Sequence, residues 1–425
     1  MKRIESLNDT FLKIKSHETT SLIYLFASAF VFFQSQIVGI TRYLSYVLLG
    51  RSDYGIYLYV AVVILLAVLM ALFNEKLVLK KYLISFAVYV LLILISYFSF
   101  PSTRQYFVEY RTDLLFNAII GLFGFAIFSN LEKIEKLYTP LLLTTRILAV
   151  IMPILYFTGI RNLLSDMEWG NKMYVVSLIY FFLLKQRTSK KQLLLDVPLF
   201  VFSFFFSLLG GRQSLAFLVL GMLLIVIFSN DSITKRIITI LVVTFAALII
   251  IVLRAQLLSL LSEILSAFNI ESRGLETLSD SSFLDFSNRN SIYDYSIHII
   301  ETNLFRVSGI FGDRFYLRAF RSNIAYAHNI FLELLIDFGL FFGIAIIALF
   351  VFALLHKFVF IKDKYRLFYI VIVIVFLAKF LVSSSIFIDT GFIIFSGFLL
   401  NKGLDKKKIK HKSLIQSAKK QHATF

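Results

Sequence analysis

The chain has 425 residues, of which 59% are hydrophobic and 16% are charged, whereas soluble domains carry about 25% charged residues. This composition excludes a water-soluble globular protein, because a fold of this length has no way to cover so much apolar surface. The absence of cysteine excludes disulfides, thiolate nucleophiles and cysteine metal sites. A net charge of +17 would suit nucleic acid in a soluble protein, but its distribution along this chain favours a membrane.

Apolar runs of roughly 15–28 residues follow one another along the chain, the length needed to cross a hydrocarbon core about 30 Å thick. The twelve runs are approximately 20–41, 55–73, 82–100, 113–129, 138–158, 171–185, 192–209, 213–229, 233–253, 328–355, 365–384 and 386–401. The semi-polar stretch 42–54 and the short run 171–185 leave a count of eleven open. We therefore predict an all-α, polytopic integral membrane protein with about 12 transmembrane helices in a single membrane domain, 1–425.

Basic residues gather in every second connection between these runs. With both termini in the cytoplasm, the cytoplasmic segments hold 27 of the 43 basic residues. This is the positive-inside pattern, and it orients the chain N-in and C-in. The basic tail, 402–425, is then a cytoplasmic segment that anchors the topology and contacts anionic lipid, rather than a nucleic-acid site.

Gly210-Gly211-Arg212-Gln213 lies where one run ends outside the cytoplasm and the next begins. Paired glycines let the backbone turn sharply and approach a ligand closely. A helix that starts at about Gln213 directs its N-terminal NH groups at the same place. Arginine beside a helix N-terminus predicts an anion site, and the alternative is an interfacial arginine that reaches lipid headgroups.

The longest polar interval, 254–327, becomes one large external loop in this topology. It holds seven arginines and no lysine. A guanidinium grips phosphate oxygens through two parallel hydrogen bonds, whereas lysine offers a point charge. The eight carboxylates of the same loop leave structural salt bridges open as the alternative for Arg314, Arg318 and the other arginines. Arg289 begins a stretch whose apolar residues recur at helical spacing, as in a helix along the membrane surface.

His328 opens the run 328–355 from the outside. A helix N-terminus disfavours imidazolium, which predicts a neutral histidine that can accept a proton. A hydrogen-bonded interfacial histidine is the alternative. Asn329 is the expected N-cap of the helix.

Glu333 and Asp337 follow at intervals of four, on one helical face. Acidic groups below a membrane surface are costly unless they are paired or functional. We expect the intramembrane bases Arg146 and Lys379 to be their partners.

The chain contains no DxD, HExxH, nucleotide-binding glycine loop or Gly-x-Ser-x-Gly motif, and no carboxylate–histidine metal spacing. We therefore predict neither a metal site nor a cofactor. Diphosphate chemistry without a metal needs another source of positive charge, and arginines supply one.

Three motifs resemble those of the O-antigen polymerase and ligase superfamily, which includes Wzy-type polymerases and WaaL-type ligases. They are Gly-Gly-Arg at 210–212, Asn-Arg-Asn-Ser-Ile-Tyr at 288–293 leading to Gly309 and Gly312, and Ala-His-Asn-Ile-Phe-Leu-Glu-Leu-Leu-Ile-Asp-Phe-Gly at 327–339. The resemblance covers about residues 190–350 through motifs and the first half of the chain through hydropathy.

The resemblance implies a metal-independent, inverting glycosyltransferase of the bacterial cytoplasmic (inner) membrane. Its donor would be an oligosaccharide on polyprenyl diphosphate, held by Arg212 and Arg289, and His328 would activate the acceptor hydroxyl as general base. Further substrate contacts are expected at Gly211, Asn329, Glu333, Arg314 and Arg318. Besides the lipid-linked oligosaccharide and the bilayer, a chain-length regulator protein is an implied partner.

Three functions stay open at this point. The Wzy-type reading is polymerisation of lipid-linked repeat units of O-antigen or capsule. The ligase reading transfers the lipid-linked glycan to a lipid A–core acceptor. A lipid-linked oligosaccharide flippase or other transporter would favour short loops and paired inverted repeats with broken helices, and the sequence shows neither.

Overall fold

The computed structural model describes residues 22–72, 76–131, 133–158, 165–186, 190–252, 256, 259–260, 262–263, 266–267, 287–320, 326–381 and 384–406. Within its helices, the side chains of a few positions, Arg212 and Arg289 among them, lie outside this description. Every regular element in these ranges is a helix, apart from one antiparallel bridge between Ile361 and Asp405. The all-α class predicted from composition is therefore confirmed.

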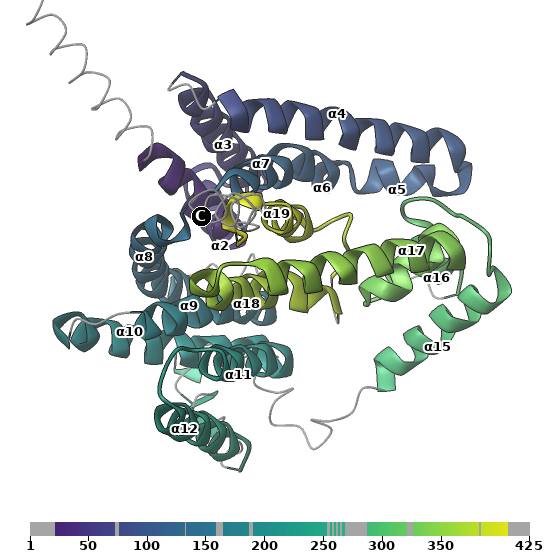
Figure 1. The fold of residues 1–425 in the computed structure, drawn as a ribbon. Coiled ribbons are helices and arrows are strands. Elements are labelled where there is room, and N and C mark those ends of the chain that lie inside the picture. The colour runs from purple at the N-terminus through teal and green to yellow at the C-terminus, as the bar shows by residue number, and fades with distance from the viewer. Residues whose placement is uncertain are drawn as a thin grey trace, which may run out of the picture.

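The helices follow one another along the chain (Figure 1). Those before residue 190 are the segment Leu22–Phe32, α2 (Gln34–Leu49), α3 (Tyr54–Leu72), α4 (Lys76–Ser99), α5 (Arg104–Glu109), α6 (Arg111–Phe116), the π-helical η2 (Asn117–Gly121), α7 (Leu122–Asn130), α8 (Tyr138–Phe157) and α9 (Asp166–Lys185). Those after it are α10 (Lys190–Ser207), α11 (Gly211–Ile227), α12 (Ile233–Val252), α15 (Ser287–Thr302), α16 (Gly312–Phe320), α17 (Ile330–Phe360), α18 (Asp363–Leu377) and α19 (Thr390–Leu399). Single 3-10 turns are η1 (Pro101–Thr103), η3 (Ile134–Leu137), η5 (Leu208–Gly210), η6 (Ala378–Leu381) and η7 (Lys402–Leu404).

The described residues include several helices that are long and apolar enough to cross a membrane. The five spans are Leu77–Ser99, Arg111–Asn130, Ile134–Phe157, Leu193–Gly210 and Ile330–Phe360. A sixth results if Leu22–Phe32 and α2, which are bent by 80°, count as one span. The chain therefore has the features of a multi-pass membrane protein.

Among the described residues, five or six helices meet these criteria of length and composition, whereas the apolar runs predict twelve, so the count of twelve stays a prediction. Two of the runs contain a break or are not helical throughout. The run 20–41 is bent at Phe33, and the run 386–401 becomes helical only at Thr390. The apolar sequence alone does not reveal these turns, so hydropathy assigns each run as a complete transmembrane helix.

The most apolar helices expose their side chains instead of burying them. Only 6% of the apolar window of α4 and 11% of that of α17 is buried in the protein. On α17, Phe341, Leu349 and Phe352 are 65–70% exposed. Leaving such side chains in water is unfavourable by about 25 cal/mol per Å² of apolar surface, whereas lipid tails accept them. These faces are consistent with contact to the bilayer.

The centre of the fold is α9, which packs against α8, α10, α11 and α18. Trp169, Tyr180 and Phe182 on this helix are fully buried. A Cβ on Gly170 would lie 1.8 Å from the backbone nitrogen of Gly210. The missing side chain therefore lets α9 touch the turn before α11 and fixes where α11 begins.

The described part of the loop 254–327 folds back onto the helical body. α15 and α16 pack against each other and against α17, at one end of that helix (Figure 1). Ile299, Leu317 and Ile336 form their shared buried cluster. The helical spacing predicted after Arg289 is confirmed, and its apolar residues contact protein.

Gly339 divides α17 into two helices. Its φ of 70° and ψ of 170° lie in a region that is essentially restricted to glycine. A Cβ there would also lie 2.9 Å from the carbonyl oxygen of Arg306. The short helix 330–338 thus changes direction before the long apolar helix 340–360 begins.

Candidate functional site

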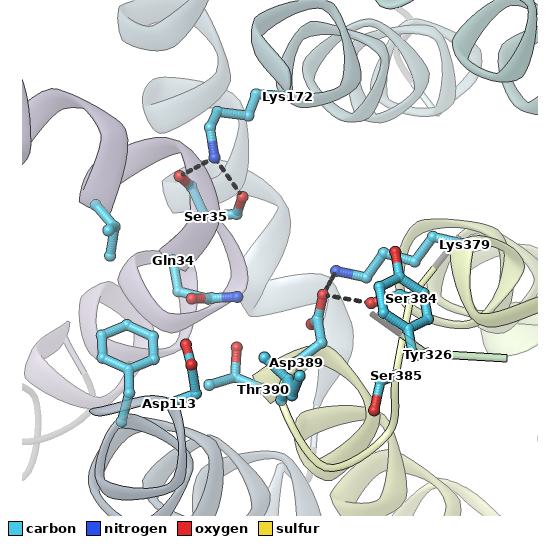
Figure 2. A pocket seen from close by; sticks show the side chains of 13 residues that line it. Gln34, Ser35, Asp113, Lys172, Tyr326, Lys379, Ser384, Ser385, Asp389 and Thr390 are labelled. Atoms are coloured by element: carbon cyan, nitrogen blue, oxygen red, sulfur yellow. Dashed lines mark hydrogen bonds and ion pairs between the residues drawn. The ribbon is translucent and has the colours of Figure 1, made fainter. Parts of the chain in front are cut away.

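Two adjoining polar cavities lie inside the helical body. Their volumes are about 290 and 310 Å³. Six residues line both cavities and join them into one space, which we call the recess: Gln34, Ser35, Lys172, Lys379, Ser384 and Asp389. Figure 2 shows how these side chains face the same space from three separate parts of the chain.

The polar start of α2 reaches the recess because the helix is broken at Phe33. This residue has a φ of −94° and a ψ of 25°, and α2 leaves the preceding helix at 80°. Gln34, Ser35 and Gln36 therefore open a new helix in the middle of an apolar run. The first NH groups of a helix lack intrahelical partners and carry partial positive charge, so polar surroundings suit them.

Two more helices begin at the recess. Gly211 starts α11 with a φ of 70°, a conformation that glycine adopts without strain. This turn brings Gln213 into the recess wall. α19 begins at Thr390, where the Asp389 carboxylate accepts a hydrogen bond of 2.8 Å from the NH of Gly391. The sharp turn predicted from the paired glycines is confirmed.

Lys172 is the cation on the α9 side of the recess. Its Nζ donates to the carbonyl oxygen of Ser35 at 3.0 Å and to the hydroxyl at 2.9 Å. It also lies 3.4 Å from a carboxylate oxygen of Glu168, one helical turn earlier. These contacts tie α9 to the start of α2 (Figure 2).

Lys379 and Asp389 form an ion pair on the opposite side of the recess. The hydroxyl of Ser384 donates to the same carboxylate at 3.2 Å. Both charged side chains keep about a quarter of their surface exposed to the recess or solvent, at 27% and 22%. This pair is therefore partly solvated, unlike a pair enclosed in protein.

A second group of charges lies next to the recess, and of its members only Ser385 lines that space. This carboxylate cluster consists of Asp313, Arg314, Glu333, Asp337 and Ser385. The guanidinium of Arg314 donates to Asp313 at 2.6 Å and to the Ser385 hydroxyl at 2.7 Å, and it lies 3.5 Å from Glu333. The Ser385 hydroxyl in turn donates to Glu333.

Backbone groups complete the cluster. The NH of Asp313 donates to Asp337 at 2.8 Å, and the NH of Ala327 donates to Asp313 at 3.1 Å. The NH of Ile386 donates to Glu333 at 3.2 Å. The cluster thus holds α16, the start of α17 and the segment before α19 together.

The positive charge of Arg314 is required in this place. The carboxylate oxygens of Asp313, Glu333 and Asp337 lie within 4.8 Å of one another, close enough for one cation to bridge them, and all three residues are buried. Burial lowers the pKa of Arg314, but the three carboxylates outweigh it and raise that pKa above its usual range. Because uncompensated buried charge is very costly, the guanidinium is the counterion that stabilises the cluster. Sequence spacing did not reveal this group, since Asp313 comes from a different segment.

The predicted residues at the start of α17 are arranged around a tight turn. Asn329 caps the helix as expected, since its side chain accepts hydrogen bonds from the NH groups of Phe331 and Leu332. His328 has a φ of 56°, which is uncommon for a residue other than glycine. Its ring lies 4.2 Å from that of Tyr326, which lines the recess. His328 therefore adjoins the recess wall.

The arginines predicted to bind substrate differ in what the structure describes. The side chains of Arg212 and Arg289 lie outside the described residues. Arg314 is enclosed in the carboxylate cluster. Arg318 binds both oxygens of Glu109 at 2.7 Å. Both arginines are therefore in salt bridges, Arg314 with the loop carboxylate of Asp313 and Arg318 with Glu109 outside the loop. A substrate role for any of the four arginines stays a prediction.

The expected partners of Glu333 and Asp337 were wrong. Arg146 instead binds both oxygens of Asp196, at 2.7 and 3.0 Å. Lys379 pairs with Asp389. The cation that Glu333 meets is Arg314, because α16, within the segment 254–327, packs against the start of α17.

Sequence reasoning missed most of the recess. Lys172 and Asp389 stand in runs that were assigned as spans, and their polarity was not used. The Gln-Ser-Gln at 34–36 was the clearest available signal, since three polar residues in succession are unusual in a span.

The all-helical fold and its long apolar helices define the class as a multi-pass helical membrane protein. Comparison with known proteins adds no family to this class, because no family model, no curated protein and no solved structure significantly matches the chain.

Proposed function

We propose that this chain is a membrane glycosyltransferase that polymerises oligosaccharide repeat units carried on polyprenyl diphosphate. The observation that supports it best is the composition of the recess wall. Gln213, beside the Gly-Gly-Arg motif, and Tyr326, beside the Ala-His-Asn motif, line cavities that share six residues. Residues next to two motifs that are more than 100 positions apart thus line one polar recess, which supports a shared substrate site.

The proposed reaction needs no redox partner. An acceptor sugar hydroxyl attacks the anomeric carbon of the donor and forms the new glycosidic bond. The bond from that carbon to the diphosphate oxygen breaks, and its electron pair leaves with the diphosphate. His328 takes the hydroxyl proton as general base, while Arg212 and Arg289 neutralise the leaving group. Attack opposite the leaving group inverts the anomeric centre.

The proposal includes a topology of about twelve membrane helices in the bacterial inner membrane, with both termini in the cytoplasm. The loop 254–327 then faces the compartment where surface polysaccharides are assembled. A reporter fused after Lys191 should read cytoplasmic, and one inserted at Ser281 should read external. A cytoplasmic signal from the Ser281 reporter would place the proposed site residues and their substrates on opposite sides of the membrane, and would reject the proposal.

Deletion of the protein tests the function in cells. A polymerase deletion should leave single repeat units on the lipid carrier and abolish long polymer on gels. A ligase deletion should instead leave long polymer on the lipid carrier that is not joined to lipid A–core. Normal polymer in both pools would reject the glycosyltransferase.

One structural feature favours a transporter as the second candidate. The sequence showed no broken helix, yet Leu22–Phe32 and α2 are bent by 80° at a polar site. Broken helices that line a central polar site are typical of secondary transporters. In cells lacking a flippase, the lipid-linked units should accumulate in the inner leaflet, where an added glycan-modifying enzyme reaches them only after the membrane is permeabilised.

A further inference from the structure

Among the side chains that the structure describes, those lining the recess carry no excess of positive charge. Lys172 and Lys379 are opposed by three carboxylates that line the same space, those of Asp113, Glu168 and Asp389. Both lysines have carboxylate partners in ion pairs. Asp113 forms no ion pair with any residue that the structure describes. A diphosphate placed here would face this carboxylate at close range, which is unfavourable.

The polar groups that remain suit hydroxyls. Gln34, Asn171 and Gln213 bring amide groups, each able to donate and to accept hydrogen bonds. The hydroxyls of Ser384 and Thr390 do the same (Figure 2). A sugar ring presents several hydroxyls, each both donor and acceptor, so a mixed lining satisfies it where a purely cationic lining would not.

Aromatic rings complete the lining. Phe116, Tyr174, Tyr326 and Phe376 each contribute to the wall of one of the two cavities. The C–H faces of a pyranose are apolar and pack on such rings, while its hydroxyls point outward to polar groups. This combination of apolar faces and a few convergent polar groups is typical of sites for small organic ligands.

The size of the recess limits the ligand. Cavities of about 290 and 310 Å³ lie at the lower end of the range for ligand sites. Each is suited to about one sugar ring, and the joined recess to a short saccharide, not to a long polyprenyl chain.

We infer that the recess is a binding site for an uncharged sugar unit, with Asp113 and Gln34 as hydroxyl-binding residues, and that the diphosphate lies outside it. This inference rests on the proposed function, which supplies a sugar on a lipid carrier. It deepens that proposal by separating the two parts of the substrate, the sugar in the recess and the anion at the arginines.

Saturation-transfer NMR on the full chain in detergent tests this separation. The probes are glucose, galactose and N-acetylglucosamine, with sodium glucuronate and sodium pyrophosphate as competitors. At least one neutral sugar should receive magnetisation, and pyrophosphate at the same concentration should not displace it. Asp113→Asn and Gln34→Met, both close in size to the native residues, should weaken binding about tenfold, the effect of losing a hydrogen bond to a buried polar or charged group.

Asp363→Asn is the matched control, because Asp363 pairs with Arg366 and Lys406 away from the recess. It should leave the sugar signal unchanged. Two recess variants keep the test valid if one fails to elute as a monodisperse species. The inference is overturned if no neutral sugar in the panel gives a signal, if both variants bind like the native chain, or if pyrophosphate displaces the sugar.

The outcome is separable from that of the proposed function. If the recess binds no sugar but deletion still leaves single lipid-linked units, the glycosyltransferase stands and the sugar site lies elsewhere. If the recess binds sugar and labelled free sugar crosses proteoliposomes that contain the protein, the recess assignment stands and the glycosyltransferase is rejected.

Discussion

The recess and the carboxylate cluster lie next to each other and differ in how far their charged side chains are exposed. In the cluster, the side chains of Arg314 and Asp313 have no exposed surface and form an ion pair of 2.6 Å. In the recess, Lys379 and Asp389 form a similar pair but remain about a quarter exposed. The comparison teaches that charged side chains inside a membrane protein have two different roles. An ion pair enclosed by protein stabilises the fold, whereas a partly exposed ion pair leaves atoms available to a ligand.

Two adjacent residues, Ser384 and Ser385, join these regions, since both line the recess. Ser384 donates to Asp389 in the recess, and Ser385 bonds Arg314 and Glu333 in the cluster. The segment before α19 therefore supplies one wall to both. Substitutions that act on only one side of this segment are the most direct way to examine the difference.

The largest effect is expected on the rate of the proposed reaction. His328→Ala should lower turnover by about 10²- to 10⁴-fold, since it removes a general base. Binding of the lipid donor should persist, because the proposed mechanism assigns that contact to the arginines. Initial rates of both proteins would be measured with excess chelator present, where the native enzyme should remain active. A variant within a few fold of the native rate, or native turnover that stops in chelator, would retire the metal-free general-base mechanism.

Arg314→Met should give the largest loss of stability, about 3–5 kcal/mol, because it leaves buried carboxylates without their cation. Unfolding of the purified protein in detergent against denaturant measures it. Arg314→Lys should recover part of the loss, as lysine restores charge without the guanidinium geometry. A loss below about 1 kcal/mol would mean that the cluster is not closed in the way described.

Lys379→Met is the matched substitution in the recess and should cost less, about 1–2 kcal/mol, between the values for exposed and buried ion pairs. Asp389 keeps its hydrogen bonds from Ser384 and the NH of Gly391, and the recess admits water. The same denaturant unfolding compares the two variants. Equal losses of unfolding free energy for Lys379→Met and Arg314→Met would contradict the distinction between the partly exposed ion pair and the enclosed one.

The smallest effect concerns the surface pair of Arg318 and Glu109. Hydrogen bonds from Arg318 lower the pKa of Glu109 below its usual value. Because the folded pKa is the lower one, the pair stabilises the fold above the unfolded pKa of about 4.3, and this contribution is lost as the pH falls through the folded value. Glu109→Gln should therefore be slightly less stable than the native chain at pH 7, and the difference should shrink as the pH falls through the folded pKa of Glu109. A gap that stays constant over this range would contradict the pairing.

Local features were predictable from sequence. The Asn329 cap, the helix after Arg289 and the sharp turn at Gly211 each depend on a few neighbouring residues, and the structure has all three. The shared buried face of Glu333 and Asp337 followed from helical spacing. Short-range geometry is written into residue spacing, so these predictions needed no knowledge of the fold.

Long-range pairing was not predictable. Arg314 meets Ser385 across 71 positions, and Arg146 meets Asp196 across 50. In the absence of the fold, Arg146 and Lys379 were reasonable partners for Glu333, and only the position of α16 excludes them. The helix breaks at Phe33 and Gly339 were not predictable either, because the hydropathy of an apolar run is the same whether the helix is straight or bent.

The kink in α17 also sets the length of the apolar helix that follows it. The helix after it, 340–360, holds 21 residues, which at 1.5 Å per residue is about 31 Å, the thickness of a bilayer's hydrocarbon core. That segment is long enough to cross the membrane alone. Glu333 and Asp337, in the nine residues before the kink, are then free to lie at the depth of the headgroups, where lipid does not oppose their charge. One glycine thereby separates the part of the helix that meets lipid tails from the part that carries acid.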